Sequence, residues 1–330
     1  MKKIRVAING FGRIGRAFYK VAKENPEIEV IAVNDLTSIE NVQYLLKYDS
    51  VYGISKYTLD GVQYISEKDP TKLPWTKLEI DVVVESTGLF TSSDKAQAHI
   101  VAGAKRVVVS APIKDDSMSV IKGATVLMGM NEDMLSTCQV SSNASCTTNA
   151  GSPLLAILDD AIGVEKAVLN TVHAYTASQS IVDGPAKKDM REGRAAAQNI
   201  VPSTTGAAIA VTKVMTHLEG LFDGISIRVP VVAGSIVDVT FIAKKNTTVE
   251  EVNSILKKAA ADARWKGIFT VTEENLVSSD IKGNPHASIA DLAFTKVVGG
   301  NLVKVLAWYD NEMGYTHTLV RHVVEAGKLI

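Results

Sequence analysis

The stretch IRVAINGFGRIG, Ile4 to Gly15, decides the fold of the first part of the chain. Its β-branched apolar start, Ile4 to Asn9, predicts a buried strand. After a glycine turn, apolar residues return at helical spacings of four and three, at Ile14, Phe18 and Val21. A strand, a glycine turn and a helix in this order predict a dinucleotide-binding motif. The glycines, which permit a tight turn and close approach of a pyrophosphate to the helix N-terminus, are Gly10, Gly12 and Gly15.

An aspartate stands at the position where this motif needs a ribose ligand. Asp35 lies twenty residues beyond Gly15 and directly after the next apolar run, Glu29 to Asn34. Its carboxylate suits the ribose hydroxyls of adenosine and repels a 2′-phosphate, so we predict NAD rather than NADP as the cofactor. The alternative is an ordinary glycine turn with an unrelated surface aspartate.

The same alternation of strand and helix continues to about residue 110. Asp81 to Glu85 and Arg106 to Val109 are nearly continuous apolar runs, as expected of parallel strands covered on both faces. The helical segment Ser92 to Ala102 lies between them. This repetition predicts an α/β fold in which a doubly wound parallel sheet, of the Rossmann type, binds NAD.

The pattern changes after about Asn149, where β-branched runs follow one another. These runs are Val168 to Val172, Ile225 to Val232, Ser235 to Ala243 and Leu302 to Trp308, with helices at about 206–218 and 249–263. Strands in succession with helices set apart predict an α+β catalytic domain with a mixed or antiparallel sheet. We place the NAD-binding domain at residues 1–147 and the catalytic domain at 148–312. An amphipathic C-terminal helix, about 313–330, joins the first domain.

Composition excludes several classes of function. The 330 residues carry 35 basic and 36 acidic side chains, so no long-range field attracts nucleic acid or an anionic membrane. No apolar run approaches the ~20 residues of a membrane helix, and the N-terminus does not read as a signal peptide. The two cysteines, Cys138 and Cys146, form no CxxC pair, which favours the cytoplasm. We predict no metal site.

Cys146 is the candidate nucleophile. It lies in SNASCTTN, Ser142 to Asn149, just before an apolar helical stretch. Backbone N–H groups at a helix start stabilise a thiolate, so we expect a lowered pKa for this thiol and attack on an aldehyde carbonyl. The alternative is an ordinary buried cysteine, which is how we interpret Cys138. Among six histidines, His173 is the best-placed base, because it follows the strand Val168 to Val172.

At these residues the sequence resembles the phosphorylating glyceraldehyde-3-phosphate dehydrogenases. The resemblance runs through the whole chain. Its motifs are INGFGRIGR at 8–16, NDLT at 34–37, LLKYDSVYG at 45–53, ESTG at 85–88, SAP at 110–112, SNASCTTN at 142–149, TVHAYT at 171–176, STTGAA at 203–208, RVPV at 228–231, SSD at 278–280 and WYDNE at 308–312.

The resemblance implies a full set of roles. Cys146 would attack glyceraldehyde 3-phosphate, with His173 as general base, and a thiohemiacetal and then a thioester would form. Inorganic phosphate would release 1,3-bisphosphoglycerate, a step of glycolysis and gluconeogenesis. The implied substrate and phosphate ligands are Ser145, Thr147, Thr176, Thr205, Gly206 and Arg228. The implied NAD ligands beyond the glycines are Arg13, Ile14, Asp35, Thr87, Gly88, Ser110 and Asn311, the last on the nicotinamide carboxamide. A homotetramer is implied, in which loop 177–201 would line a neighbour's cofactor site.

Four positions depart from the family's pattern. Ala150 replaces a second cysteine, Ser178 replaces an aspartate or threonine, and Met313 replaces a tryptophan. Val231–Gly234 changes the loop after Arg228. The last change keeps a related reaction open, the oxidation of erythrose 4-phosphate, in which water releases the acyl group. A third reading is a non-catalytic dinucleotide-binding protein that retains the fold.

Overall fold

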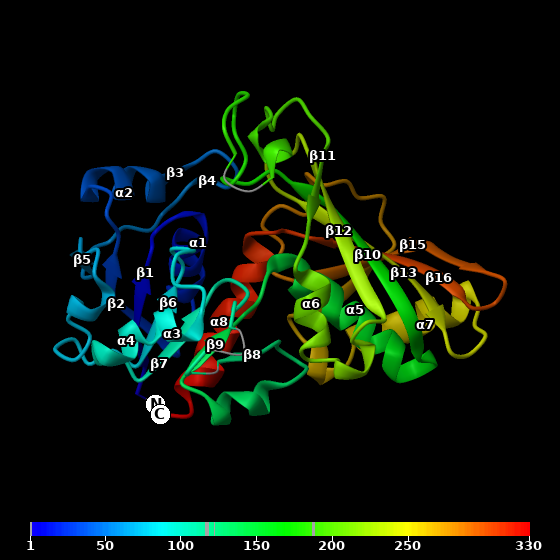
Figure 1. Ribbon diagram of the computed structural model, residues 1–330, viewed down its shortest axis with the longest axis horizontal. Helices are drawn as coiled ribbons and strands as arrows, with labels where there is room; N and C mark the ends of the chain where they lie inside the picture. Colours follow the sequence, from blue (N-terminus) through cyan, green and yellow to red (C-terminus); the bar gives the residue numbers. More distant parts are fainter. Residues whose placement is uncertain (1, 116–118, 122, 187–188) are drawn as a thin grey trace. The chain divides into compact units, whose positions relative to one another are not determined.

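The computed structural model describes residues 2–115, 119–121, 123–186 and 189–330 (Figure 1). The chain forms two compact units. The first consists of Met1–Ser145 with Thr316–Ile330, and the second of Cys146–Tyr315. The C-terminal helix therefore contributes most of its length to the first unit, although the whole second unit precedes it in the sequence.

The first unit is built on a seven-stranded sheet in which every neighbouring pair is parallel. The strand order is β5-β2-β1-β6-β7-β9-β8. The bounds are β1 Ile4–Asn9, β2 Ile28–Asn34, β5 Gln63–Ile65, β6 Val82–Glu85, β7 Arg106–Val109, β8 Ala124–Thr125 and β9 Val140–Ser142. The central position of β1 explains its continuous apolar sequence, because Val6, Ala7 and Ile8 are fully buried. The predicted doubly wound parallel sheet is confirmed.

Several helices of the first unit contact strands of this sheet. The helices of the unit are α1 Arg13–Ala22, α2 Ile39–Lys47, α3 Ser93–Ala96, α4 Ala98–Val101 and α8 Met313–Gly327, with 3₁₀ turns at Pro70–Lys72 and Glu132–Thr137 and a small ribbon of β3 Tyr48–Asp49 and β4 Gly53–Ile54. Among them, α1 contacts β1 and β2, α3 contacts β9 and α4 contacts β7. The predicted single helix at 92–102 is two short helices that meet at Gln97. Ser92 begins the first of them by accepting a hydrogen bond from the Lys95 N–H.

The second unit contains another seven-stranded sheet, and this one is mixed. Its order is β11-β12-β10-β13-β16-β15-β14. The bounds are β10 Val164–Ala174, β11 Val201–Thr204, β12 Phe222–Val229, β13 Ser235–Ala243, β14 Phe269–Thr272, β15 Ser288–Val298 and β16 Leu302–Tyr309. The predicted mixed sheet is therefore confirmed, while β15 is a strand that the sequence analysis did not find.

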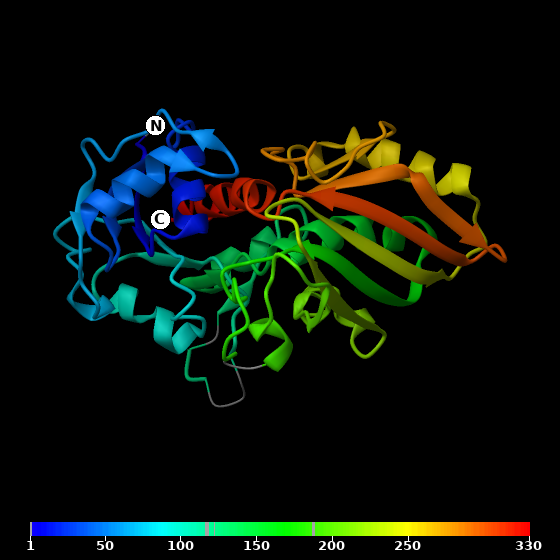
Figure 2. The ribbon, with the colours of Figure 1, turned by 90° about the horizontal axis from the view of Figure 1, so that it is seen from above.

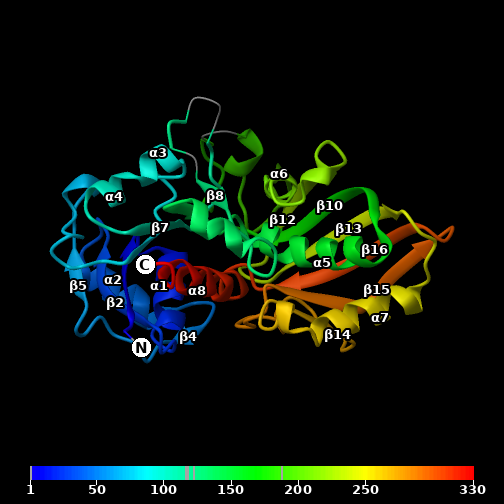
Figure 3. The same ribbon diagram turned by 90° about the horizontal axis from the view of Figure 1, so that it is seen from below.

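One face of the mixed sheet is covered by helices. These are α5 Cys146–Ile162, α6 Ala207–Thr212 and α7 Val249–Ala260, with 3₁₀ turns at Met190–Gly193, Thr216–Leu218 and Ala263–Trp265. Figure 3 shows α5 along the sheet, and Figure 2 shows α7 beside β15, in agreement with their contacts. Strict alternation of buried and half-exposed residues along β13 follows from this one-sided cover.

Neither a membrane span nor a metal cluster occurs within the described residues. Every helix there is too short or too polar to cross a bilayer. The same residues contain no grouping of three or more histidine, cysteine, aspartate or glutamate side chains that could hold a metal ion.

Candidate active site

The start of α5 and the end of β10 bring together a thiol and an imidazole. Cys146 is the first residue of α5, and its Sγ lies 3.3 Å from Nε2 of His173 near the end of β10. Strand β10 lies under α5, with Leu169 packed against Gly151 of that helix. This distance allows direct proton transfer between Sγ and Nε2, so the two best sequence candidates do meet.

The other ring nitrogen of His173 has two close neighbours. Nδ1 lies 2.6 Å from the carbonyl oxygen of Ala174 and 2.5 Å from an Nη1 of Arg228. In the tautomer that carries its proton on Nδ1, Nδ1–H donates to the Ala174 oxygen, and Nε2 is unprotonated and able to accept the thiol proton. In that tautomer Nη1 of Arg228, which can only donate, has the Ala174 oxygen and not Nδ1 as its acceptor. Arg228 owes its position to the parallel register of β10 and β12, which pairs it with His173. Its Nη1 donates to the Ala174 oxygen at 3.2 Å.

Burial keeps both members of the pair neutral. Burial, and next the charge of Arg228, lower the pKa of His173 to about 3, against a hydrogen bond to Ala174 that acts upward. Burial raises the pKa of the Cys146 thiol, although Arg228 and the N–H and hydroxyl of Thr147 act in the opposite direction. The predicted lowering of the thiol pKa at the helix start is therefore wrong. The helix N–H groups do act as expected, but desolvation outweighs them.

A tyrosine that the sequence analysis missed lies behind this pair. The hydroxyl of Tyr309, at the end of β16, is 2.9 Å from Oγ1 of Thr147 and 2.8 Å from Oγ1 of Thr171. Its ring stands edge-on to the His173 imidazole, with centroids 5.9 Å apart. Burial raises the pKa of the Tyr309 phenol well above its usual range, so the group stays a neutral hydrogen-bonding anchor. The Thr147 hydroxyl is thereby held beside both the Tyr309 hydroxyl and the Cys146 thiol.

The other predicted substrate ligands lie in loops beside these strands. Ser145 is half-buried directly before α5. Thr176 pairs its hydroxyl with that of Ser178 at 3.0 Å, so the shorter Ser178 side chain completes a hydroxyl pair in the loop after β10. Thr205 accepts a hydrogen bond from the Ala207 N–H, and Gly206 is exposed at the start of α6. Direct contacts thus join Cys146, His173 and Arg228, whereas the Thr176 and Thr205 hydroxyls bond within their own segments.

In the first unit, the three motif glycines differ in what surrounds them. A Cβ on Gly10, whose φ is +90°, would lie 2.7 Å from the backbone nitrogen of Thr87, and one on Gly15 would lie 2.1 Å from the Gly10 oxygen. A Cβ on Gly12 would meet no atom of the described residues within 4 Å. Gly10 and Gly15 are therefore needed for packing. Gly12 leaves open space at the N-terminus of α1, as a bound pyrophosphate requires.

The remaining predicted NAD ligands of this unit follow the carboxyl ends of its strands. Asp35 follows β2 and accepts hydrogen bonds from the N–H groups of Phe11 and Thr37. Thr87 and Gly88 follow β6, and Ser110 follows β7. Arg13 and Ile14 are half-exposed in the first turn of α1, where the Arg13 guanidinium lies 3.1 Å from Asp49. Carboxyl ends of parallel strands are where such sheets bind nucleotides.

Asn311 lies in the second unit, directly after β16. Its Oδ1 accepts hydrogen bonds from the Gly234 N–H at 3.0 Å and the Ser235 hydroxyl at 3.2 Å. Two donors on the oxygen fix the orientation of the amide, so Nδ2 is the atom that can donate to a ligand. Gly234 has a φ of +90°, and a Cβ there would lie 2.4 Å from the Ser278 oxygen. The altered loop Val231–Gly234 therefore includes a glycine that its backbone requires.

Cys138, predicted to be a packing cysteine, is only partly buried. Its Sγ lies 3.6 Å from the Met134 oxygen, and it lines a surface depression of about 310 Å³ with Arg106 and Gln139. Both cysteines are free thiols.

Comparison with known proteins agrees with this arrangement. Residues 4–93 match the family described as glyceraldehyde 3-phosphate dehydrogenase, NAD binding domain, and residues 145–311 match its C-terminal domain. A glyceraldehyde-3-phosphate dehydrogenase of Streptomyces coelicolor is 45% identical over 338 residues, covering 98% of each chain. One of Borreliella burgdorferi is 47% identical over 335 residues, covering 96% of this chain and 98% of the relative. One of Geobacillus stearothermophilus is 45% identical over 330 residues and 96% of each chain. These sequence identities extend over nearly the whole chain, and they agree with the folds of the two units and with the thiol–imidazole pair. The chain therefore belongs to the glyceraldehyde-3-phosphate dehydrogenase family.

Proposed function

We propose that this chain oxidises glyceraldehyde 3-phosphate with NAD and inorganic phosphate, forming 1,3-bisphosphoglycerate. The observation that carries the proposal is the contact of 3.3 Å between Sγ of Cys146 and Nε2 of His173 in a chain of this family. A binding protein that had merely kept the fold would have no use for a nucleophile, a base and a guanidinium in mutual contact.

Cys146 and His173 divide the first chemical step between them. As Sγ bonds to the aldehyde carbon, the thiol proton passes to Nε2 of His173 and the carbonyl oxygen gains the electron pair. The protonated imidazole then gives that proton to the oxygen, which becomes the hydroxyl of the thiohemiacetal, and Nε2 is free to accept again. Because the pKa of His173 is lowered to about 3, the ring is a neutral base at working pH and releases the proton readily.

When bound, NAD would supply the hydride acceptor for the oxidation of the thiohemiacetal to a thioester on Cys146. His173 takes the hydroxyl proton in that step. Phosphate then attacks the thioester carbon, the C–S bond breaks, and the acyl phosphate leaves, while His173 returns its proton to the sulfur and restores the Cys146 thiol. Arg228 suits the binding of a phosphate, because its guanidinium can offer two parallel hydrogen bonds. We assign the substrate and phosphate subsites to Ser145, Thr147, Thr176, Thr205, Gly206 and Arg228.

The NAD site is assigned to the first unit, residues 1–147 with 313–330, and to Asn311. Open space at Gly12 supports this assignment, and so does the Asp35 carboxylate, which suits ribose hydroxyls. The full set is Gly10, Gly12, Arg13, Ile14, Gly15, Asp35, Thr87, Gly88, Ser110 and Asn311. Residues 148–312 would supply the chemistry.

We further propose a homotetramer in the cytoplasm. The sheet face of the second unit opposite α5 carries exposed apolar side chains, including Val168 (58% exposed), Ile225 (53%) and Leu302 (41%). In loop 177–201, Ile181 and Met190 are 86% and 90% exposed. Apolar surface of this kind is covered in stable assemblies, here by further copies of the chain. Residues 187 and 188 of that loop lie outside the described residues. Two free cysteines suit a reducing compartment.

The test follows reduced-nicotinamide absorbance with NAD and glyceraldehyde 3-phosphate, with and without inorganic phosphate. A phosphate-dependent rise is expected, and the Cys146→Ser variant should abolish it. A rise with erythrose 4-phosphate that needs no phosphate would instead assign the related reaction. No turnover with either aldehyde, although NAD binds, would support the non-catalytic reading.

A further inference from the structure

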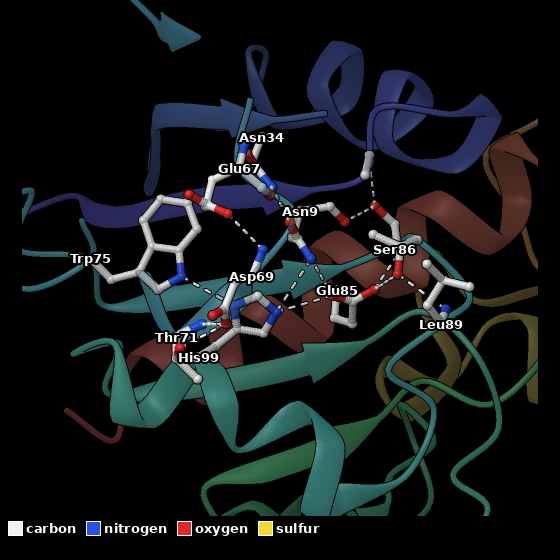
Figure 4. A network of polar contacts seen from close by, with 12 residues as sticks. Asn9, Asn34, Glu67, Asp69, Thr71, Trp75, Glu85, Ser86, Leu89 and His99 are labelled. Carbon is white, nitrogen blue, oxygen red and sulfur yellow. Dashed lines mark hydrogen bonds and ion pairs between the residues drawn. The ribbon is translucent and has the colours of Figure 1, made fainter. Parts of the chain in front are cut away.

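Three neighbouring parallel strands of the first unit end in polar residues that are almost fully buried. Asn9 ends β1, Asn34 ends β2 and Glu85 ends β6, and their exposed fractions are 2%, 5% and 1%. The sheet register places Asn9 opposite both of the others. Figure 4 shows the resulting network, which also includes His99 and Trp75. Burying this much polar surface is costly unless each polar group is hydrogen-bonded, so each group should have a partner. The direction of each hydrogen bond in the network can therefore be traced from groups that can only donate or only accept.

One end of the network is fixed by a backbone. Nδ2 of Asn34 donates to the Glu67 carbonyl oxygen at 2.9 Å, and Oδ1 of Asn34 accepts from the Glu67 N–H at 2.9 Å. The Asn34 amide therefore cannot be turned over. Nδ2 of Asn34 also donates to Oδ1 of Asn9 at 2.7 Å, which leaves Nδ2 of Asn9 to donate to Oε2 of Glu85 at 2.6 Å.

The other end is fixed by an indole. Nε1 of Trp75, which can only donate, lies 3.1 Å from Nδ1 of His99, so Nδ1 is the acceptor. His99 therefore carries its proton on Nε2 and donates it to Oε2 of Glu85 at 3.0 Å. Nδ2 of Asn9 lies 3.4 Å from the same Nε2, because both donors converge on one carboxylate oxygen.

The second carboxylate oxygen of Glu85 points towards the cofactor loop. Oε1 accepts hydrogen bonds from both the N–H and the hydroxyl of Thr87. The segment that Glu85 holds in this way is the one that Gly10 packs against, and the Ser86 hydroxyl donates to the Gly10 oxygen at 2.7 Å. A single buried carboxylate thus receives four donors, two from the interior and two from the loop.

We propose that Glu85 is a positioning residue for NAD binding, oriented by His99 and Asn9 and acting through Thr87. This rests on the proposed function, because Thr87 is assigned there as an NAD ligand. Only an acceptor with two oxygens satisfies donors on both sides, since neither Asn9 nor His99 can reverse its hydrogen bond. An amide at this position would place its NH₂ group against two donors or against Thr87.

The experiment compares NAD affinity, by titration calorimetry, in the full-length wild-type protein and in Glu85→Gln. We expect binding to weaken at least about tenfold, as for loss of hydrogen bonds to a buried charged group. The KM for glyceraldehyde 3-phosphate and the rate at which iodoacetamide alkylates Cys146 without NAD should stay unchanged. Glu67→Gln is the matched control, because it removes the same charge, while the contacts of Glu67 to Asn34 are made by its backbone and its side chain accepts from the Asp69 N–H, away from Glu85. It should bind NAD as the wild type does.

A second pair of variants tests the hydrogen-bond directions. Trp75→Phe frees Nδ1 of His99, so the imidazole can move its proton there and accept, on Nε2, a hydrogen bond from the amide that Glu85→Gln introduces. The double variant should therefore lose less affinity than the product of the two single losses. The ¹⁵N shifts of His99 in the wild type should report a proton on Nε2.

Either of two results would overturn the proposal. One is unchanged NAD affinity in Glu85→Gln, whichever nitrogen of wild-type His99 carries the proton. The other is equal loss of NAD affinity and of Cys146 reactivity, which would indicate a general structural role. If Glu85→Gln does not fold, two other measurements decide instead. They are the nitrogen of wild-type His99 that carries the proton and the NAD affinity of Trp75→Phe. Absence of NAD binding by the wild type would refute the proposed function itself, which distinguishes the two failures.

Discussion

Replacement of His173 by asparagine should slow the acylation of Cys146 at pH 7 at least about 30-fold. Without a base, the reaction depends on thiolate that is already present. A thiol with the ordinary pKa of about 8.5 is only about 3% ionised at pH 7, and burial raises the pKa of Cys146, which lowers that fraction further. The upper end of the expected loss is about 10⁴-fold, the usual limit for a general base.

The shape of the pH profile separates this reasoning from a simple loss of fold. Burial and Arg228 lower the pKa of His173 to about 3, so the wild-type base is neutral throughout the range from pH 5 to pH 8 and acylation should change little there. In His173→Asn the rate should rise about tenfold per pH unit, because thiolate is then formed by solution pH alone.

The assay is the stopped-flow burst of reduced nicotinamide with glyceraldehyde 3-phosphate and no inorganic phosphate. His217→Asn is the control, because His217 is an exposed histidine paired with Asp159 at 2.8 Å. It should follow the wild-type profile. Parallel profiles for wild type and His173→Asn, differing only in height, would refute the assignment of His173 as the proton acceptor.

Three further predictions concern the cofactor site and the assembly. Gly12→Ala should weaken NAD binding at least about tenfold, because its methyl group enters space reserved for the pyrophosphate, while the free energy of unfolding changes by less than about 1 kcal/mol. Gly10→Ala should instead destabilise the protein by about 2 kcal/mol or more, since its φ is +90° and Thr87 blocks a Cβ; equal unfolding midpoints in urea would contradict this. Val168→Lys should convert a tetramer into smaller species in sedimentation equilibrium, and an unchanged mass would place the interface elsewhere.

Strands with a simple burial pattern were predictable from sequence. The predicted runs Arg106–Val109 and Ser235–Ala243 coincide with β7 and β13, because the first is buried on nearly all sides and the second alternates regularly. Strand β15 was missed because its register with β16 shifts between Asp291 and Lys296, which interrupts the alternation of apolar residues. Helix α2 was missed because it buries only two side chains, Val42 and Leu46, and so carries a weak apolar stripe.

Site residues were predictable where a local motif carries them, and not where the fold assembles them. The glycine turn and the peptide around Cys146 are local patterns. Tyr309 joins Thr147 from 162 positions away, and His99 meets Glu85 only because α4 packs beside the sheet. The direction of the Cys146 pKa shift also depends on tertiary burial, which no sequence motif reports.

The position of Arg228 affects proton transfer between the neutral thiol and the neutral imidazole. Its guanidinium lies at Nδ1 of His173, on the opposite side of the ring from Cys146. The positive charge is therefore closer to the imidazole than to the sulfur, and at rest it opposes proton transfer from Sγ to Nε2. An anion bound to Arg228, as proposed for a phosphate, offsets that charge and raises the basicity of His173. Proton transfer from Cys146 would then be opposed less whenever a phosphate group, including that of the aldehyde substrate, is bound at Arg228.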